Sequence, residues 1–295
     1  MTGQRCPLCG CDRYRVYLHG SNGELTSAAL GSSRSDVSYG TILRCLNCRF
    51  GFAKNRPTEE ELATLYRELH GEVYDAEQPG RNQTAARHLQ IVQAHISSAR
   101  LLDVGCSSGA FLRCASQAGW NCVGVEPSAT AINKARTVVG ANVQLVCATI
   151  EKARLQKSSF DVVTLWDVLE HVSEPVKFLH FCASLLKRGG YLFANVPDLD
   201  SFQARLFGRR WPLLLWEHLN YFNRSSLMMC GESAGLNPIR TGRRPVSFSV
   251  KYILYRLNQH RVPGAALGYH LLNRGWTKDL IVTVPLGEIF AVWQR

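Results

Sequence analysis

From Ala99 to the C-terminus, short apolar runs of strand length alternate with longer segments in which apolar residues recur at helical spacing. This alternation constrains the fold more than any other feature, because strands separated by helices pair in parallel and a parallel sheet needs helices on both faces. We therefore expect an α/β fold with a doubly wound sheet. The expected strands cover 100–104, 122–125, 143–146, 160–166 and 191–196, and the expected helices cover 109–118, 128–139 and 174–186.

A glycine-containing loop follows the first expected strand. It runs from Asp103 and Gly105 to Gly109, and in open α/β sheets ligands bind beyond the carboxyl ends of the strands. Glu126 ends the next strand, where a carboxylate can accept hydrogen bonds from both hydroxyls of a ribose. A dinucleotide-binding loop would have glycine in place of Ser107, to admit a pyrophosphate. The loop therefore indicates an adenosyl ligand without phosphates rather than NAD or FAD.

These residues resemble the motifs of class I S-adenosylmethionine (SAM)-dependent methyltransferases. The segment 103–109 resembles their first motif, 125–128 their second, and 186–190 the turn before their fifth strand. The stretch 160–172 is similar to a segment of the ubiquinone-biosynthesis O-methyltransferases. The resemblance implies methyl transfer from SAM on a seven-stranded Rossmann-like sheet, in which the last strand, Ile289–Gln294, is inserted antiparallel.

The resemblance also implies roles for individual residues. Asp103 orders the loop around the methionine part of SAM, Glu126 holds the ribose, and Ala148 and Thr149 lie near the adenine. The full set of residues expected to bind the cofactor is Asp103, Gly105, Cys106, Ser107, Gly109, Glu126, Pro127, Ala148, Thr149, Trp166 and Asp167.

Three residues are candidates for catalysis. His171 follows Glu170 after the fourth strand, and His218 lies in a later aromatic-rich segment. Either histidine could act as the general base that helps methyl transfer to a hydroxyl. Two other interpretations stay open: Asp167, Glu170 and His171 hold a divalent cation, as some quinone-type relatives are thought to do, or Glu170 and His171 cap the following helix.

Four aromatic residues near His218 suggest a wall for the methyl acceptor. The stretch 210–222 resembles that of small-molecule methyltransferases with an N-terminal cysteine-pair module. We expect its aromatic side chains to form a lid or an acceptor pocket, with core packing as the other interpretation. These residues are Trp211, Trp216, Tyr221 and Phe222.

Two Cys-x-x-Cys pairs, Cys6/Cys9 and Cys45/Cys48, precede the α/β segment. Two such pairs can place four thiolates tetrahedrally around Zn²⁺, and a site with four protein ligands is structural. Cys11 is an alternative ligand, and redox-active thiols are the alternative chemistry. We expect a structural zinc ion in a zinc-ribbon-like module, and the remaining cysteines to be reduced.

The charge distribution raises the question of a polyanionic partner. The net charge is +11, and 201–295 hold 13 Lys and Arg residues against 4 Asp and Glu. These arginines are spread along the chain, which favours a solvated basic surface. We expect a small-molecule acceptor and O-methylation. A methyltransferase acting on rRNA or tRNA, with the zinc module docking RNA, is one alternative, and a non-catalytic SAM-binding scaffold protein is another.

The expected organisation has three parts: a zinc-binding module at 1–56, a helical linker or cover at 57–98 and a methyltransferase domain at 99–295. The N-terminal residues lack the apolar stretch of a signal peptide, and the longest apolar runs are too short to span a membrane. We therefore expect a cytoplasmic protein. The acceptor, the methylated element and the oligomeric state stay open.

Overall fold

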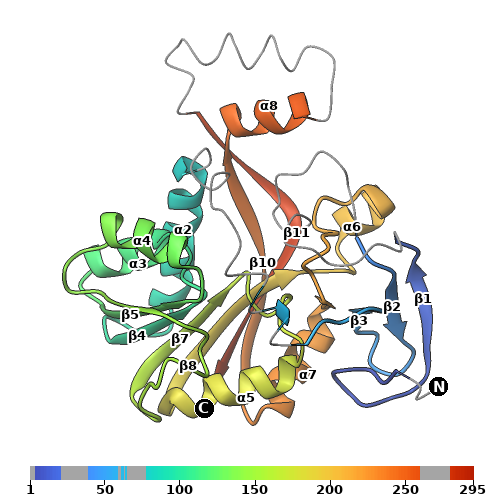
Figure 1. Cartoon of the computed structure of the whole chain (residues 1–295), viewed down its shortest axis with the longest axis horizontal. Helices are drawn as coiled ribbons and strands as arrows, with labels where there is room; N and C mark the ends of the chain where they lie inside the picture. Colours follow the sequence, from blue (N-terminus) through green and yellow to red (C-terminus); the bar gives the residue numbers. More distant parts are fainter. Residues whose placement is uncertain (1–3, 21–38, 59–60, 63, 65–77, 260–279) are drawn as a thin grey trace.

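The computed structural model describes residues 4–20, 39–58, 61–62, 64, 78–259 and 280–295. Two sheets form its framework, a large one with helices on both faces and a small one beside it (Figure 1). The large sheet has the strand order β10-β11-β8-β7-β4-β5-β6. Its strands are β4 (Arg100–Val104), β5 (Asn121–Glu126), β6 (Gln144–Cys147), β7 (Phe160–Trp166), β8 (Leu186–Pro197), β10 (Asn237–Ser249) and β11 (Ile281–Gln294).

The large sheet is parallel except at one strand. β11 lies between β8 and β10 and is antiparallel to both, whereas β4 to β8 pair in parallel. The parallel strands are rich in buried apolar residues because helices cover both faces. The expected doubly wound, seven-stranded sheet with an antiparallel last strand is confirmed, although this strand begins at Ile281 rather than at Ile289.

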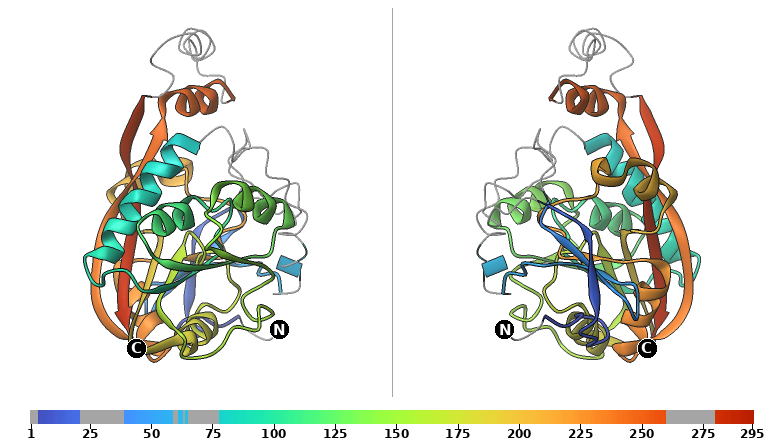
Figure 2. Two further views of the ribbon diagram at one scale, coloured as in Figure 1. Left: turned by 90° about the vertical axis from the view of Figure 1, so that its left-hand side faces the viewer. Right: turned by 90° about the vertical axis from the view of Figure 1, so that its right-hand side faces the viewer.

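Helices pack on both faces of this sheet (Figure 2). On one face lie α2 (Gln78–Gln93), α3 (Ala110–Gln117) and α4 (Ala129–Val138), and on the other lie α5 (Pro175–Leu185) and α7 (Arg224–Ser233). Leu112 and Ile132 are fully buried in the first core, and Leu179 and Leu227 in the second. Burying one such side chain contributes about 1.5–3 kcal/mol, so these faces hold the helices against the sheet.

Glycine and proline mark the ends of two elements. Helix α5 ends at Leu185, one residue before the expected end at 186, and Gly189 and Gly190 lie in an irregular start of β8. The φ angle of Gly189 is +79°, so a glycine suits this bulge. Helix α2, in the expected helical linker or cover at 57–98, begins at Gln78 and contains Pro79 in its first turn, a place that proline fits.

The small sheet combines strands from two distant parts of the chain. Its order is β1-β2-β3-β9, in which β9 (Asn220–Tyr221) follows the large sheet's β8 in the sequence. The other strands are β1 (Tyr14–Leu18), β2 (Ile42–Cys45) and β3 (Gly51–Ala53). β9 pairs antiparallel with β3. The N-terminal segment is therefore joined to the rest of the molecule through a shared sheet.

Shorter elements complete the chain. Between β8 and β9 lie α6 (Phe202–Phe207) and a 3₁₀ turn at Gly208–Arg210, and α8 (Val250–Gln259) follows β10. Thr58 and Glu61 bond to one another in the pattern of a capping box. Part of the expected linker or cover at 57–98 lies outside the described residues.

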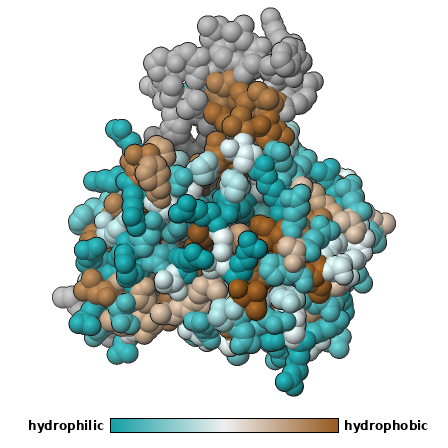
Figure 3. Space-filling view, turned by 180° about the vertical axis from the view of Figure 1, so that it is seen from behind, coloured by the Kyte–Doolittle hydropathy of each residue, from teal (hydrophilic) through white to brown (hydrophobic). Residues whose placement is uncertain are grey.

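The surface is mostly polar. Seen from behind, apolar side chains gather chiefly at the end that carries α8 (Figure 3), where Leu280 and Val282 are exposed. Within the described part of the chain, no helix is both long and apolar enough to cross a bilayer.

Candidate active site

The loop between β4 and α3, which we call the cofactor loop (103–109), turns sharply at the edge of the large sheet. The φ angles of Gly105, Ser107 and Gly109 are +73°, +48° and +80°, in a region that glycine adopts without strain. A Cβ atom on Gly105 would lie 2.7 Å from Cγ2 of Val168. The glycine therefore lets the cofactor loop close against the segment that follows β7.

Two carboxyl groups flank the cofactor loop. Asp103 is buried and accepts a hydrogen bond from the hydroxyl of Thr164 at 2.7 Å, and burial raises the pKa of Asp103 to about 7. Glu126 accepts hydrogen bonds from the N–H groups of Ser107 and Ser128 at 3.1 and 2.9 Å. Burial raises the pKa of Glu126, and these two bonds oppose the shift. Each carboxylate oxygen has a further lone pair, so Glu126 can still accept hydrogen bonds from ribose hydroxyls.

The other residues expected to bind the cofactor lie along the same edge of the sheet. All of them follow or end a parallel strand, so the structure brings them to the carboxyl ends of β4, β5, β6 and β7. What they bind stays a prediction. These residues are Cys106 after β4, Pro127 after β5, Ala148 and Thr149 after β6, and Trp166 and Asp167 at the end of β7.

Glu170, His171 and His218, which we call the histidine cluster, come together from two segments. One ligand atom from each side chain lies within 4.8 Å of the others, and the two imidazole rings meet edge to face. Nδ1 of His171 lies 3.0 Å from the carbonyl oxygen of Glu217, and Nδ1 of His218 lies 2.9 Å from that of Leu213. Because a carbonyl only accepts, we assign the proton of each ring to Nδ1, so that the neutral ring has its lone pair on Nε2.

Burial controls the protonation of the histidine cluster. It lowers the pKa of His171 to about 4 and that of His218 well below the usual range, so both rings are neutral at pH 7. Burial also raises the pKa of Glu170 well above the usual range. The interpretation that Glu170 and His171 cap the next helix is wrong, because the N-cap of α5 is Glu174. The cluster can instead accept a proton or bind a cation.

Asp167 belongs to a different polar group. Arg244 on β10 faces Glu288 on β11 and forms a buried ion pair with it, and Nη2 of Arg244 also lies 3.4 Å from Asp167. The side-chain amide of Asn195 on β8 donates to Asp167 and to Glu288. No local motif marks these partners, because only the strand order brings β8, β10 and β11 next to the end of β7.

His88 on α2 is a further residue that the sequence did not indicate. Its ring stacks on Trp166, with ring centroids 3.9 Å apart, and burial lowers its pKa well below the usual range. In the described part of the chain, seven buried polar side-chain atoms lack a hydrogen-bond partner, and five of them belong to His88, Trp166, Glu170 and Arg244. Buried polar groups normally have partners, so this concentration favours a site that receives a polar ligand.

The expected aromatic wall is wrong for three of its four residues. Trp211 and Tyr221 lie in a core under the small sheet, and Phe222 lies in the core that α5 and α7 cover. Their side chains are at most 1% exposed. Trp216 is partly exposed and packs near Gly40. The aromatic residues here serve packing, which is the commoner use of such side chains.

The four cysteines of the two Cys-x-x-Cys pairs form one cluster, which we call the cysteine cluster. The Sγ–Sγ distances are 3.6 Å for Cys6–Cys48 and 3.6 Å for Cys9–Cys45. Sulfurs bound tetrahedrally to zinc at about 2.3 Å lie about 3.8 Å apart, so these residues fit the ion. Cys11 stands outside the cluster and bonds to the backbone of Arg13.

Comparisons with known proteins give a consistent picture. Residues 74–241 match a family model described as a methyltransferase domain. A ubiquinone biosynthesis O-methyltransferase of Colwellia psychrerythraea is 31% identical over 227 residues, covering 66% of this chain and 92% of that protein. Its counterpart in Bordetella avium is 28% identical over 183 residues, covering 58% of this chain and 74% of that protein.

Solved structures share the fold at low sequence identity. The 1,6-didemethyltoxoflavin-N1-methyltransferase of Burkholderia thailandensis, with bound substrate and S-adenosylhomocysteine, superposes with a TM-score of 0.52 at 14% identity, covering 85% of this chain and 97% of that chain. A SAM-dependent methyltransferase from Archaeoglobus fulgidus gives a TM-score of 0.51 at 19% identity, covering 73% and 94%. At these sequence identities, the similarity shows that the chains share a fold.

Proposed function

Because the chain belongs to the methyltransferase-domain family and is a SAM-dependent methyltransferase, we propose that it O-methylates a small-molecule acceptor. The observation that carries this proposal is the histidine cluster, which brings together two neutral imidazoles, that of His171 after β7 and that of His218 before β9. The segment after β7 contacts the cofactor loop through Val168 and Gly105. The similarity to ubiquinone biosynthesis O-methyltransferases supports oxygen as the methylated element.

In this proposal, Asp103 and Glu126 serve cofactor binding, and the histidine cluster serves proton transfer. When bound, SAM supplies a methyl group on a positively charged sulfur. In this proposal Asp103 orders the loop around the methionine part of the cofactor and Glu126 holds its ribose, and the bonds from Thr164 and Ser107 fix the two carboxyl groups. Alignment of the reacting atoms accounts for about 7–11 kcal/mol of a barrier in favourable cases, so this positioning is a main contribution of the protein.

The histidine cluster receives the proton of the acceptor hydroxyl. Nε2 of His171 or His218 would accept it as the carbon–oxygen bond forms and the methyl carbon–sulfur bond of bound SAM breaks, with S-adenosylhomocysteine as the leaving group. Burial lowers the pKa of His171 to about 4, below the value near the working pH at which a general base is most effective. We therefore expect the acceptor hydroxyl to be an acidic one, such as that of a phenol. The unpartnered atoms of His88, Trp166 and Arg244 are buried, and Arg244 acts electrostatically on both His88 and Glu170. We propose that these atoms bond to polar groups of the acceptor.

The experiment that tests the proposal is transfer from methyl-labelled SAM into a desalted cell extract, separated into small-molecule, RNA and protein fractions. We expect label in the small-molecule fraction, on an oxygen that mild chemical cleavage of aryl methyl ethers identifies. RNase-sensitive label in the macromolecular fraction would overturn the proposal in favour of an RNA acceptor. SAM binding without label in any fraction would favour the scaffold interpretation.

The histidine cluster also supports a second interpretation, in which it holds a divalent cation. The ligand atoms of Glu170, His171 and His218 lie within 4.8 Å of one another, whereas Asp167, expected as a ligand, bonds to Arg244 and Asn195. Titrating the purified protein with Mg²⁺, Mn²⁺ and Zn²⁺ separates the two interpretations. If turnover continues after a chelator has removed divalent cations, the histidine cluster acts as a general base. If turnover requires an added cation, the cluster binds that cation.

For the cysteine cluster we propose structural zinc. Four sulfurs at distances near those of a zinc–thiolate tetrahedron support this assignment. Elemental analysis of the purified chain should give one zinc per molecule, and Cys48→Ser should reduce it. The matched control is Cys114→Ser, since Cys114 is a partly buried thiol on α3 outside the cluster. Full zinc occupancy in Cys48→Ser would count against this site.

A further inference from the structure

The small sheet connects the cysteine cluster to the histidine cluster. β3 begins three residues after Cys48, and β9 begins two residues after His218. The two strands pair, with Gly51 opposite Tyr221 and Phe52 opposite Asn220, and Ala53 N–H donates to the carbonyl of Leu219 at 3.0 Å. The segment that carries His218 therefore leads directly into β9, an edge strand of the small sheet.

From β9 the contacts continue to the loop that holds Glu170 and His171. The N–H groups of Leu219 and Asn220 donate to the carbonyl of Glu170 at 2.8 and 3.0 Å. The side-chain amide of Asn220, which is fully buried, donates to the carbonyls of Leu169 and Val172 at 2.9 and 2.7 Å. Asn220 thus fixes the backbone on both sides of Glu170 and His171.

Arg56, three residues after β3, joins the same three segments. Its guanidinium donates to the carbonyl of Leu219 at 2.6 Å and to Oδ1 of Asn220 at 2.9 Å. It also donates to the carbonyls of Val172 and Ser173, beyond His171. A planar group with five N–H donors can hold several carbonyls at fixed angles, which the single ammonium of a lysine cannot reproduce.

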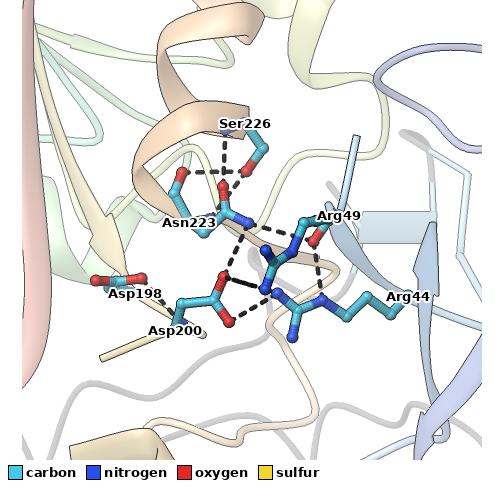
Figure 4. A network of polar contacts seen from close by, with 6 residues as sticks. All are labelled: Arg44, Arg49, Asp198, Asp200, Asn223 and Ser226. Carbon is cyan, nitrogen blue, oxygen red and sulfur yellow. Dashed lines mark hydrogen bonds and ion pairs between the residues drawn. The ribbon is translucent and has the colours of Figure 1, made fainter. Parts of the chain in front are cut away.

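The loop that contains Cys45 and Cys48 is also held by a network of polar contacts around Asp200 (Figure 4). Arg44, directly before Cys45, forms two hydrogen bonds of 2.7 Å with Asp200, which follows β8. Asn223, the N-cap of α7, donates to Asp200 and to the carbonyl of Arg49, directly after Cys48. The Cys45–Cys48 turn is therefore held between the large sheet and β9.

We propose that Arg56 and Asn220 are positioning residues that couple the cysteine cluster to the histidine cluster, so that closing the cysteines around their metal sets the geometry of Glu170, His171 and His218. The proposal rests on the proposed function in treating the histidine cluster as the acceptor side. The hydrogen bonds of the cofactor loop stand outside this path, because those of Asp103, Ser107 and Glu126 lie among β4, β5 and β7. The loop meets the neighbouring segment at the apolar contact of Gly105 with Val168, one residue before the carbonyl of Leu169 that Asn220 holds. Metal in the N-terminal module therefore controls the acceptor side and leaves SAM binding unchanged.

The test uses the full chain with ¹³C-labelled histidine imidazoles, compared by NMR before and after zinc is removed with a chelator and restored. The signals of His171 and His218, assigned with His171→Gln and His218→Gln, should move on zinc removal and return on reloading. The signals of His95 and His180 should stay, and the dissociation constant for SAM should change by less than about twofold. Unmoved signals of His171 and His218 would overturn the proposal.

Variants separate coupling from general stability. Arg56→Lys and Asn220→Ala, in the zinc-loaded chain, should shift the same two histidine signals, and the matched controls Arg188→Lys and Asn237→Ala should not, since both control residues are exposed. If Asn220→Ala fails to fold, Arg56→Lys alone decides between coupling and its absence. Loss of SAM binding in Arg56→Lys would overturn the proposal, because it requires the cofactor loop to be independent. These readouts need no acceptor, so they are separate from the labelling test of the proposed function.

Discussion

The cofactor loop and the histidine cluster lie at the same edge of the large sheet but are held by different kinds of contact. The loop is fixed by its neighbours in sequence and by β5, since the N–H groups of Gly105 and Cys106 both donate to the carbonyl of Val125. The histidine cluster is fixed from a distance, through Asn220, Arg56 and the small sheet. A substitution in the loop should therefore affect SAM, whereas one along the second path should affect the acceptor side.

The largest expected effect is a loss of turnover without a loss of SAM binding, when a histidine of the histidine cluster is replaced. His218→Gln and His171→Gln remove the candidate bases, and loss of general base catalysis costs about 10²–10⁴-fold in rate. We expect turnover of the identified acceptor to fall by this amount in at least one variant, while the SAM dissociation constant stays within about twofold. Single-turnover rates and calorimetric SAM binding check this, with His95→Gln as the control. Unchanged turnover in both variants would contradict the assignment.

A change in the cofactor loop should instead weaken SAM binding. Gly105→Val places a Cβ atom 2.7 Å from Val168 and forces a φ of +73° on a β-branched residue. Strain of about 1–3 kcal/mol predicts a SAM dissociation constant that rises by up to about 100-fold. Gly235→Val is the matched control, because Gly235 has a φ of +83° with no atom near its Cβ position. Equal SAM affinity in Gly105→Val and the wild type would refute the close approach.

Glu126→Gln should give a smaller loss of SAM affinity. The amide keeps the shape of the side chain but places N–H groups or a neutral oxygen against the N–H groups of Ser107 and Ser128. Hydrogen bonds to a charged group contribute about 1.5–3 kcal/mol, so we expect a loss of about 10–100-fold in calorimetric SAM binding. The histidine signals should not shift. A shift of His171 or His218 in this variant would show that the two regions are coupled.

The smallest expected effect is a pH dependence of the free energy of unfolding that arises from Asp103 in the cofactor loop. Burial raises the pKa of Asp103 from 3.8 to about 7, so the folded state binds the proton more tightly than the unfolded state. The stability from this group is fully present below pH 3.8 and is lost as the pH rises through about 7. The SAM-free wild type should therefore lose stability relative to Asp103→Asn between pH 5 and 7, by at most about 1.4 kcal/mol per unit. Denaturant unfolding at these pH values measures it, and parallel curves would contradict it.

The sequence predicted the cofactor loop better than the histidine cluster, because local contacts hold the loop and distant contacts hold the cluster. Asp103, Gly105 and Glu126 sit at strand ends within one stretch of the chain, so their spacing and the alternating pattern were enough to bring them together. β7 was predicted residue by residue at Phe160–Trp166, because a buried parallel strand is a continuous apolar run.

The acceptor side depends on contacts that no local pattern records. β9 has two residues, too few for a periodic signal, and its pairing with β3 joins residues far apart in sequence. Arg244 and Glu288 meet only because β11 is inserted beside β10 with that register. His88 comes from α2, which the sequence assigned to a linker. The sequence did indicate His171, His218 and Glu170, but it left open whether they were neighbours.

The shared small sheet has a consequence for exchanging parts between related proteins. The predicted module at 1–56 ends before Thr58, yet the edge strand that completes its sheet is Asn220–Tyr221. A chimera that transplants 1–56 alone would set a foreign β3 against the resident β9 and would place the donor's residue 56, in place of Arg56, against the resident carbonyl of Leu219. The exchangeable unit is discontinuous in the gene: the N-terminal segment together with 217–223.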